Sequence, residues 1–338
     1  MQVIKEINKE RLDWVDVSKG ILILMVVFGH MDNYAEMANI NDPIIERLCL
    51  IERTWTPYFM CAFFIITGFC SNFSKPFKEF IVGKFKALII PGVTISILVN
   101  IFEWRGIFNL IRPIPGTLIH GPAWFLSALF LSCIIYYIIV KYINNMRARI
   151  LIYVALVSTG LALNMYLPQI IEFWYIPHAF MLTPFLEIGK ILKSRSHELF
   201  TIRTISISLL VYILSLLAIL LLSNYDKIGI FRRITINWIT LIPSYICAIS
   251  GSIMIFALAH AIKRSMILKF LGKHTLVIYL LNTHFIVFYY RMLSNYFNVN
   301  VMQSVLTFFI AYIATMLTCS AISYLLNSKY TSFLLGKF

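Results

Sequence analysis

A lysine and a histidine in the first apolar stretch of the chain, Lys19 and His30, have side chains suited to acid–base chemistry. In an α-helix each residue turns by roughly 100° and rises about 1.5 Å, so these two side chains share one face, about 16 Å apart. An ionisable side chain is costly to keep inside a membrane, so this face is expected to line a polar cavity within the protein. A neutral imidazole there can accept a proton from a weak nucleophile.

The composition predicts an integral membrane protein. The chain has 338 residues, of which 60% are hydrophobic and 13% charged, far more apolar surface than one soluble domain can cover. No cleavage site of small residues follows the first apolar run, which predicts a retained first span rather than a removed signal peptide. We expect one membrane domain over residues 1–338 in the cytoplasmic membrane, with lipids as partners.

The hydropathy pattern predicts an all-α fold of about ten transmembrane helices, each long enough to cross about 30 Å of hydrocarbon. The expected spans are 17–34, 55–73, 87–103, 122–140, 150–166, 177–192, 204–223, 239–262, 274–291 and 301–326.

The basic residues predict the orientation of these spans. With both termini in the cytoplasm, 21 of the 29 Lys and Arg residues fall on the cytoplasmic side. Residues 1–16 then form a cytoplasmic N-terminal segment and residues 327–338 a cytoplasmic C-terminal tail. The net charge of +14 is read as a topology signal and as contacts with anionic lipid, which argues against a nucleic-acid partner.

Neither a metal site nor a bound cofactor is expected. The six cysteines are scattered among apolar segments without C-x-x-C spacing, and no His, Asp and Glu residues have the spacing of metal ligands. The turn formers within residues 104–121 favour a re-entrant or lid-like excursion on the outer side.

Five stretches resemble the acyltransferase-3 family of membrane-bound O-acyltransferases. The first is RLDWVDVSKG at 11–20, because a basic residue ten intervening positions before a histidine, here Lys19 and His30, is that family's signature in the first helix. The others, in the family's order, are FFIITG at 63–68, KALIIP at 86–91, AWFLSALF at 123–130 and LGKHTLVIYL at 271–280. The fourth is similar to the branch of fucose 4-O-acetylase-like proteins.

The chain also departs from the family pattern. Where a histidine often follows the I-Y-L-L element, this chain has Asn282, and His284 comes two residues later. The basic pair that often precedes the third span is reduced to Lys84 and Lys86.

The resemblance implies transfer of an acyl group, most often acetyl, from cytoplasmic acyl-coenzyme A to a hydroxyl of a surface polysaccharide or a lipid-linked glycan. His30 is then the general base, supported by Asp16. Coenzyme A is a polyanion, and the basic residues Lys19, Lys84 and Lys86 are candidates for binding its phosphates. Acyl-coenzyme A would be a co-substrate, with no permanently bound cofactor.

Four residues are candidates for the acceptor side, because they fall at or near the outer ends of spans: His120, Trp124, His178 and His284. Each has a structural alternative. Aromatic residues gather at membrane interfaces in any case, and a histidine within a membrane, His30 included, can simply hydrogen-bond two helices together. Asp16 and Lys19 are three residues apart, so a local ion pair is an alternative to a direct role for Asp16.

The main rival function is a transporter or flippase for a lipid-linked glycan, which also needs polar groups inside a bundle of spans. A transporter is expected to show internal repeats and matching broken helices, and none is evident. A glycan polymerase or ligase usually has a large outer loop, and no predicted outer loop exceeds about twenty residues.

Overall fold

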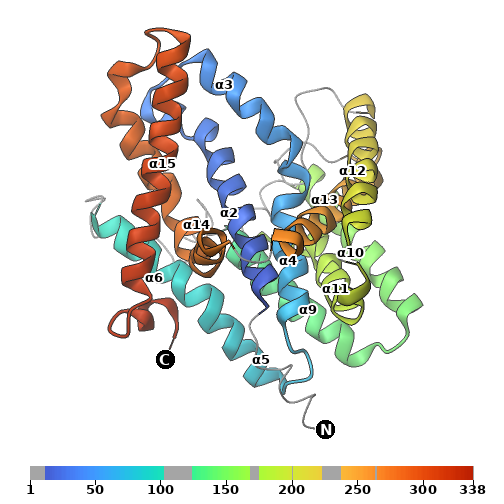
Figure 1. The fold of residues 1–338 in the computed structure, drawn as a ribbon. Coiled ribbons are helices and arrows are strands. Elements are labelled where there is room, and N and C mark those ends of the chain that lie inside the picture. Colours follow the sequence, from blue (N-terminus) through green and yellow to red (C-terminus); the bar gives the residue numbers. More distant parts are fainter. Residues whose placement is uncertain are drawn as a thin grey trace.

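The computed structural model describes residues 12–102, 124–167, 175–199, 201–222, 237–262 and 265–337, and its regular elements are all helices (Figure 1). The longer ones are α2 (Asp13–Asn33), α4 (Thr56–Cys70), α5 (Phe77–Lys84), α6 (Ile90–Phe102), α9 (Trp124–Tyr142), α10 (Met146–Tyr166), α11 (Ile176–Leu199), α12 (Ile202–Leu222), α13 (Leu241–Ile262), α14 (Met266–Met292) and α15 (Val301–Leu326). Shorter ones are η1 (Glu36–Ala38), α3 (Pro43–Cys49), η2 (Leu50–Thr54), the π turn η3 (Phe85–Ile89), η5 (Ser294–Tyr296) and η6 (Ser332–Leu335).

Every predicted span overlaps one of these helices. Among the described residues, seven helical stretches are long and apolar enough to cross a membrane: α2, residues 77–99, α9, α10, α12, α13 and α15. The remaining predicted spans are α4, with only 15 residues, and α11 and α14, in which polar and charged side chains interrupt the apolar run. The prediction of an all-helical, multi-pass membrane protein is therefore confirmed.

Burial separates a central helix from peripheral ones. In α2, 67% of the 18-residue stretch with the highest hydropathy is buried inside the protein, whereas the corresponding share in α12 is 22%. The exposed side chains of α12 include Leu210, Leu214 and Leu221, which suit contact with lipid tails. Among these seven stretches, the helix that carries Lys19 and His30 thus has the largest buried share.

Glycines let α2 and α14 touch backbone to backbone. An added Cβ at Gly20 would lie 2.1 Å from the carbonyl oxygen of Leu268, and one at Gly272 would lie 1.8 Å from that of Asp16. Both distances are far below contact, so only glycine fits at either position. Lipid tails are as apolar as the helices, so such close packing, rather than exclusion of water, holds membrane helices together. Asp13 pairs with Lys269 near the starts of both helices, and His30 contacts Asn282 further along both, so the two helices run in the same direction.

The start of α2, α5 and the turn η6 lie toward one end of the molecule, and α3 lies toward the other (Figure 1). We call the first the terminal end. At the opposite end, Asp42 fastens the loop after α2 to the start of α15. Its carboxylate accepts hydrogen bonds from the Ser304 hydroxyl and from the backbone N–H groups of Asn298 and Ile44.

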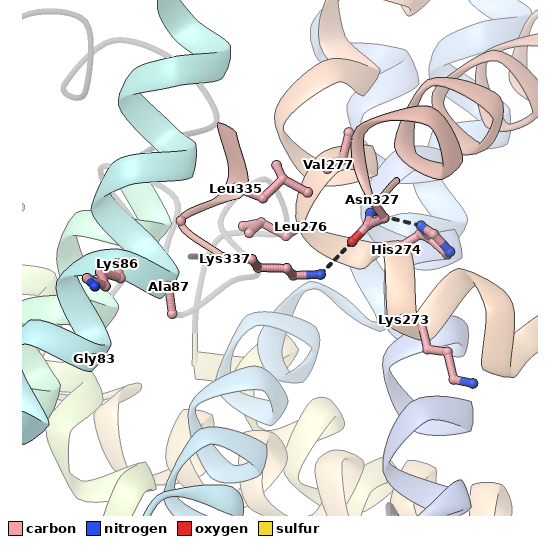
Figure 2. Close-up of a pocket in the computed structure, with 11 residues that line it drawn as sticks. Gly83, Lys86, Ala87, Lys273, His274, Leu276, Val277, Asn327, Leu335 and Lys337 are labelled. Carbon is pink, nitrogen blue, oxygen red and sulfur yellow. Dashed lines mark hydrogen bonds between the residues drawn. The ribbon is translucent and has the colours of Figure 1, made fainter. Parts of the chain in front are cut away.

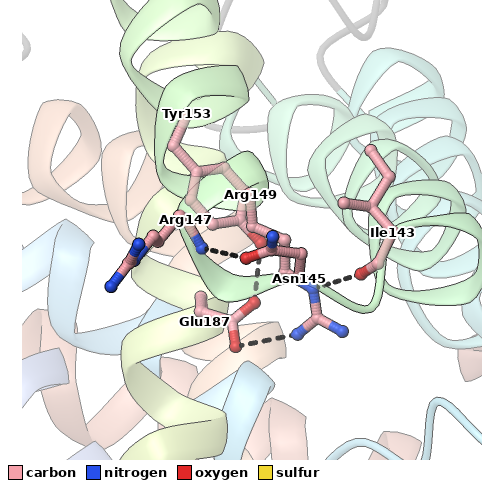
Figure 3. A network of polar contacts seen from close by, with 6 residues as sticks. All are labelled: Ile143, Asn145, Arg147, Arg149, Tyr153 and Glu187. Atoms are coloured by element: carbon pink, nitrogen blue, oxygen red, sulfur yellow. Dashed lines mark hydrogen bonds and ion pairs between the residues drawn. The ribbon is translucent and has the colours of Figure 1, made fainter.

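A buried ion pair joins α10 to α11 (Figure 3). Glu187 accepts a hydrogen bond of 2.7 Å from the Tyr153 hydroxyl and pairs with Arg149 at 3.4 Å, and both charged side chains are about nine-tenths buried. Arg149 also donates through Nε to the carbonyl of Ile143 in the preceding turn. These contacts link two neighbouring helices near one end of α10.

The glycine contact predicts a sharp difference between two alanine substitutions. Gly272→Ala forces α2 and α14 apart, so we expect loss of about 1–3 kcal/mol of stability, the range for overpacked cores. Gly83→Ala is the matched control, because an added Cβ there meets nothing within 4 Å. Thermal unfolding of the purified proteins measures the difference, and equal melting temperatures for the two variants would contradict the packing argument.

The Asp42 clasp predicts an acid-dependent loss of stability. Burial raises the pKa of this carboxyl, but the hydrogen bonds from Ser304, Asn298 and Ile44 outweigh it, so the pKa lies below its ordinary value. The carboxylate therefore stabilises the fold above the unfolded-state pKa of about 3.9, and this contribution is lost as the pH falls through the lower folded-state value.

At neutral pH we expect Asp42→Asn to cost about 1–3 kcal/mol, the penalty for a broken buried hydrogen bond. The gap in melting temperature between this variant and the wild type should narrow as the pH is lowered from 6 to 3. Other carboxyls titrate equally in both proteins, so a gap that stays constant over this range would rule out the clasp.

Candidate functional site

His30 lies on α2 opposite Asn282 of α14. The imidazole Nδ1 is 2.6 Å from the Asn282 side-chain oxygen, a contact that joins positions 252 residues apart in the chain. Asn282 is fully buried, and its amide nitrogen donates to the backbone carbonyls of Tyr279, at 2.6 Å, and Ile278, at 3.1 Å. The close packing of α2 on α14 thus brings the predicted base against a fixed polar partner.

This arrangement selects one tautomer of the imidazole. The Asn282 amide nitrogen faces two carbonyls, so its oxygen must face His30, and the contact requires a hydrogen on His30 Nδ1. In the neutral ring Nε2 then carries the lone pair. The bond to Asn282 also joins two helices, which is the structural role that the sequence left open for His30. The same bond leaves Nε2 able to accept a proton.

A cavity of about 230 Å³, which we call the inner cavity, begins beside Lys19 and ends at Tyr279. Tyr279 precedes Asn282 by three residues, roughly 4.5 Å of helical rise, so the cavity stops about one turn below the His30 contact. Its lining is apolar apart from a few groups: Lys19, Met60, Phe63, Ala87, Leu88, Phe125, Leu126, Gly272, Lys273, Thr275, Leu276 and Tyr279.

A second cavity of about 360 Å³ adjoins the first at the terminal end, and we call it the terminal cavity. The two share Ala87, Lys273 and Leu276 in their linings. The other lining residues of the terminal cavity are Gly83, Lys86, His274, Val277, Asn327, Leu335, Gly336 and Lys337 (Figure 2).

The three lysines predicted to bind the donor lie in different places. Lys19 lines the inner cavity and Lys86 the terminal cavity. Lys84 lines neither; its ammonium donates to the Ser71 hydroxyl at 2.6 Å and lies over the ring of Phe80.

Asp16, predicted to support His30, is 2% exposed, and its backbone carbonyl contacts Gly272. Its place is thus in the α2–α14 contact, near Lys19 rather than near His30.

An aromatic cluster lies beyond His30. Tyr34 contacts the imidazole edge to face at 5.8 Å between ring centroids and lies close to Tyr175. Tyr175 in turn packs against Trp124 and His178, with centroids 5.6 and 5.4 Å away. Two of the predicted acceptor-side residues, Trp124 and His178, are therefore brought together and connected to His30 through two tyrosines.

Tyr175 has a φ of 52°, in the left-handed region that non-glycine residues rarely adopt. Such strain persists only where the surrounding structure enforces it, and it is common at functional sites. Here it turns the chain into α11 and keeps the ring of Tyr175, which is 9% exposed, within the cluster.

The other predicted acceptor-side residues are not brought to this cluster. His284 follows Asn282 by two residues, a rotation of about 200°, so it projects from the far side of α14. His120 and the predicted lid at 104–121 lie outside the described residues. Within the described ranges, no three His, Cys, Asp or Glu side chains are grouped so as to hold a metal ion.

Sequence reasoning missed Asn282, Tyr34 and Lys273. Asn282 stood out only as a departure from the family pattern, although a buried amide in a predicted span was itself a signal. Tyr34 is four residues after His30 and so lies on the same helical face. Lys273 was part of a quoted motif, but nothing local indicated that it would lie level with Lys19.

Comparison with known proteins agrees with the sequence resemblance. No curated protein matches the chain. A family described as an acyltransferase domain matches residues 12–325, which include every spanning helix described above apart from the last residue of α15. The chain therefore belongs to the acyltransferase-3 family of membrane acyltransferases.

Proposed function

We propose that this protein transfers an acetyl group from acetyl-coenzyme A, supplied at the terminal end, to a hydroxyl of a glycan held at the opposite side. The acceptor is a surface polysaccharide or its lipid-linked precursor, and the protein acts in the cytoplasmic membrane with both termini inside. The observation that carries the proposal is the His30–Asn282 contact, because it leaves Nε2 of a neutral imidazole able to accept a proton. His30 lies between the inner cavity, which is lined by lysines, and the aromatic cluster.

The donor enters from the terminal end in this proposal. Its phosphates carry negative charge and stay out of the hydrocarbon, while the thioester arm is narrow and largely uncharged. The inner cavity suits that arm, since Phe63 and Leu126 offer apolar contact and Lys19 and Lys273 add positive charge at its mouth. The cavity ends at Tyr279, which directs the acyl end toward His30.

The acceptor approaches from the aromatic cluster. Sugar rings present apolar C–H faces and polar hydroxyls, and Trp124 and Tyr175 provide flat surfaces with polar edges. We propose a glycan as the acceptor because the sequence resembles fucose 4-O-acetylase-like proteins. Tyr34, between this cluster and the imidazole, guides one hydroxyl toward Nε2.

The reaction then balances as follows. His30 Nε2 takes the proton of the sugar hydroxyl as its oxygen attacks the thioester carbonyl, and a C–O bond forms. The tetrahedral intermediate collapses, the C–S bond breaks, and the imidazolium returns the proton to the departing thiolate. Asn282 holds the ring by accepting from Nδ1–H throughout. General-base catalysis of this kind contributes about 10²–10⁴ in rate.

Acyl transfer is tested with labelled acetyl-coenzyme A and a mixture of bacterial surface glycans given to the purified protein. We expect label on the glycan with wild type and a loss of about 10²–10⁴ in rate with His30→Ala. His284→Ala is the matched control, since His284 lies on the opposite side of α14. Equal labelling by His30→Ala and wild type would remove His30 from the mechanism. Movement of a lipid-linked glycan without label on it would favour the transporter.

Asn282 is proposed as a positioning residue, so its test needs more than loss of rate. We expect Asn282→Ala to lower kcat about tenfold or more, because the ring loses its orienting bond. Asn282→Asp keeps the bond and adds a charge that stabilises the imidazolium, so the acid limb of the pH–rate profile should move to higher pH. A profile that keeps its midpoint in Asn282→Asp would show that this side chain does not act through His30.

A further inference from the structure

The terminal cavity gathers three lysines from separate parts of the chain (Figure 2). Lys86 comes from the π turn before α6, Lys273 from α14 and Lys337 from the end of the chain. None of the described residues that line the cavity is acidic. Three lysines in the lining of one concave site, without a described carboxylate among them, favour a ligand with several negative charges.

Residues near the C-terminus form a wall of this cavity. After α15 the chain folds back through η6, and we call residues 332–337 the strap. Gly336 has a φ of 70°, and an added Cβ would lie 1.9 Å from the carbonyl oxygen of Lys86. Leu335 is 4% exposed. The strap is thus anchored on the π turn by a residue that must be glycine and by a buried leucine.

Hydrogen bonds with uncharged partners position the strap lysine. The Lys337 ammonium donates to the Asn327 side-chain oxygen at 2.5 Å, and the Asn327 amide lies 3.2 Å from His274 Nδ1, as Figure 2 shows. The backbone N–H of Lys337 donates to the carbonyl of Ser332, closing the turn. No ion pair with an acid is needed to hold Lys337 in place, so its charge remains available to a ligand.

The π turn on the facing wall has a simple cause. Pro91 has no amide hydrogen, so it cannot make the helical bond to Ala87, and the helix widens over residues 85–89 just before it. This turn places Ala87 in the linings of both cavities and Lys86 in that of the terminal cavity. The two cavities therefore adjoin along this wall, which places both within reach of one extended ligand.

We propose that the terminal cavity binds the phosphates of the nucleotide half of the donor, and that the strap supplies one of their ligands, Lys337. The inference rests on the proposed function, because it takes the donor to be acyl-coenzyme A. A phosphate group is matched by several ammonium donors, and Lys86, Lys273 and Lys337 all belong to the lining of this cavity. Anionic lipid headgroups carry the same chemistry, so the experiment separates the two sources.

The experiment measures binding to the full-length protein in discs of zwitterionic lipid, by calorimetry, for coenzyme A and for its phosphate-free fragment pantetheine. In Lys337→Gln we expect the Kd for coenzyme A to rise about tenfold, since a charge-assisted contact is lost, while the Kd for pantetheine stays unchanged. Lys329→Gln is the matched control, because Lys329 is an exposed lysine between α15 and the strap and lies outside both cavity linings. Gly336→Ala, which displaces the strap, should weaken coenzyme A binding as well.

Each result has a clear consequence. Unchanged coenzyme A affinity in Lys337→Gln overturns the assignment of Lys337, and equal weakening of both ligands shows that the strap only supports the fold. If wild type binds coenzyme A but addition of anionic lipid displaces it, and Lys337→Gln abolishes that competition, the cavity holds a headgroup instead. If wild type binds no coenzyme A, the proposed function fails along with this inference.

Discussion

The backbone contact between α2 and α14 is the constraint on which the candidate site depends. At Gly20 and Gly272 each helix lies directly against a carbonyl of the other, so no side chain separates the axes. In a membrane such contact replaces the hydrophobic effect as the source of helix association. It also fixes the register of the two helices, and the register places His30 within 2.6 Å of Asn282. A displacement of about 1 Å is enough to cost a catalytic group much of its effect, so the glycines are as much part of the site as the histidine.

Polar residues are concentrated where that contact shields them. Asn282 uses its oxygen and its amide nitrogen inside the protein, to His30 and to two carbonyls of its own helix, so its burial leaves none of these groups unsatisfied. The same polar residues lower the hydropathy of α14, which is why this helix is not among the seven apolar enough to cross a membrane by composition alone. Its stability in the bundle therefore depends on packing against α2 rather than on exposure of an apolar surface.

The two ends of the candidate site differ in their chemistry. Lysines line two adjoining cavities at the terminal end, and aromatic side chains gather beyond His30, with the imidazole between them. The donor and the acceptor that we propose differ in chemistry, one a charged, water-soluble molecule and the other a sugar, and each end suits one of them. The wall of the terminal cavity depends on Pro91, which forces a π turn, and on Gly336, which lets the strap lie against that turn. Both are residues whose backbone properties, rather than their side-chain chemistry, shape the cavity.

The sequence by itself determined the membrane class, the positions of the helices and the pairing of Lys19 with His30 on one face, because these follow from local composition and from the helical repeat. It placed Trp124 and His178 at helix ends, but it did not show that Tyr175 would join them. It singled out His284 as a candidate and Asn282 only as a departure from the family pattern, although only Asn282 contacts His30. Only the tertiary structure decided that choice, and it also brought Lys273 and Lys337 to the cavities. The reason is physical: which face of α14 meets α2 depends on where two glycines, more than 250 residues apart, allow the backbones to touch.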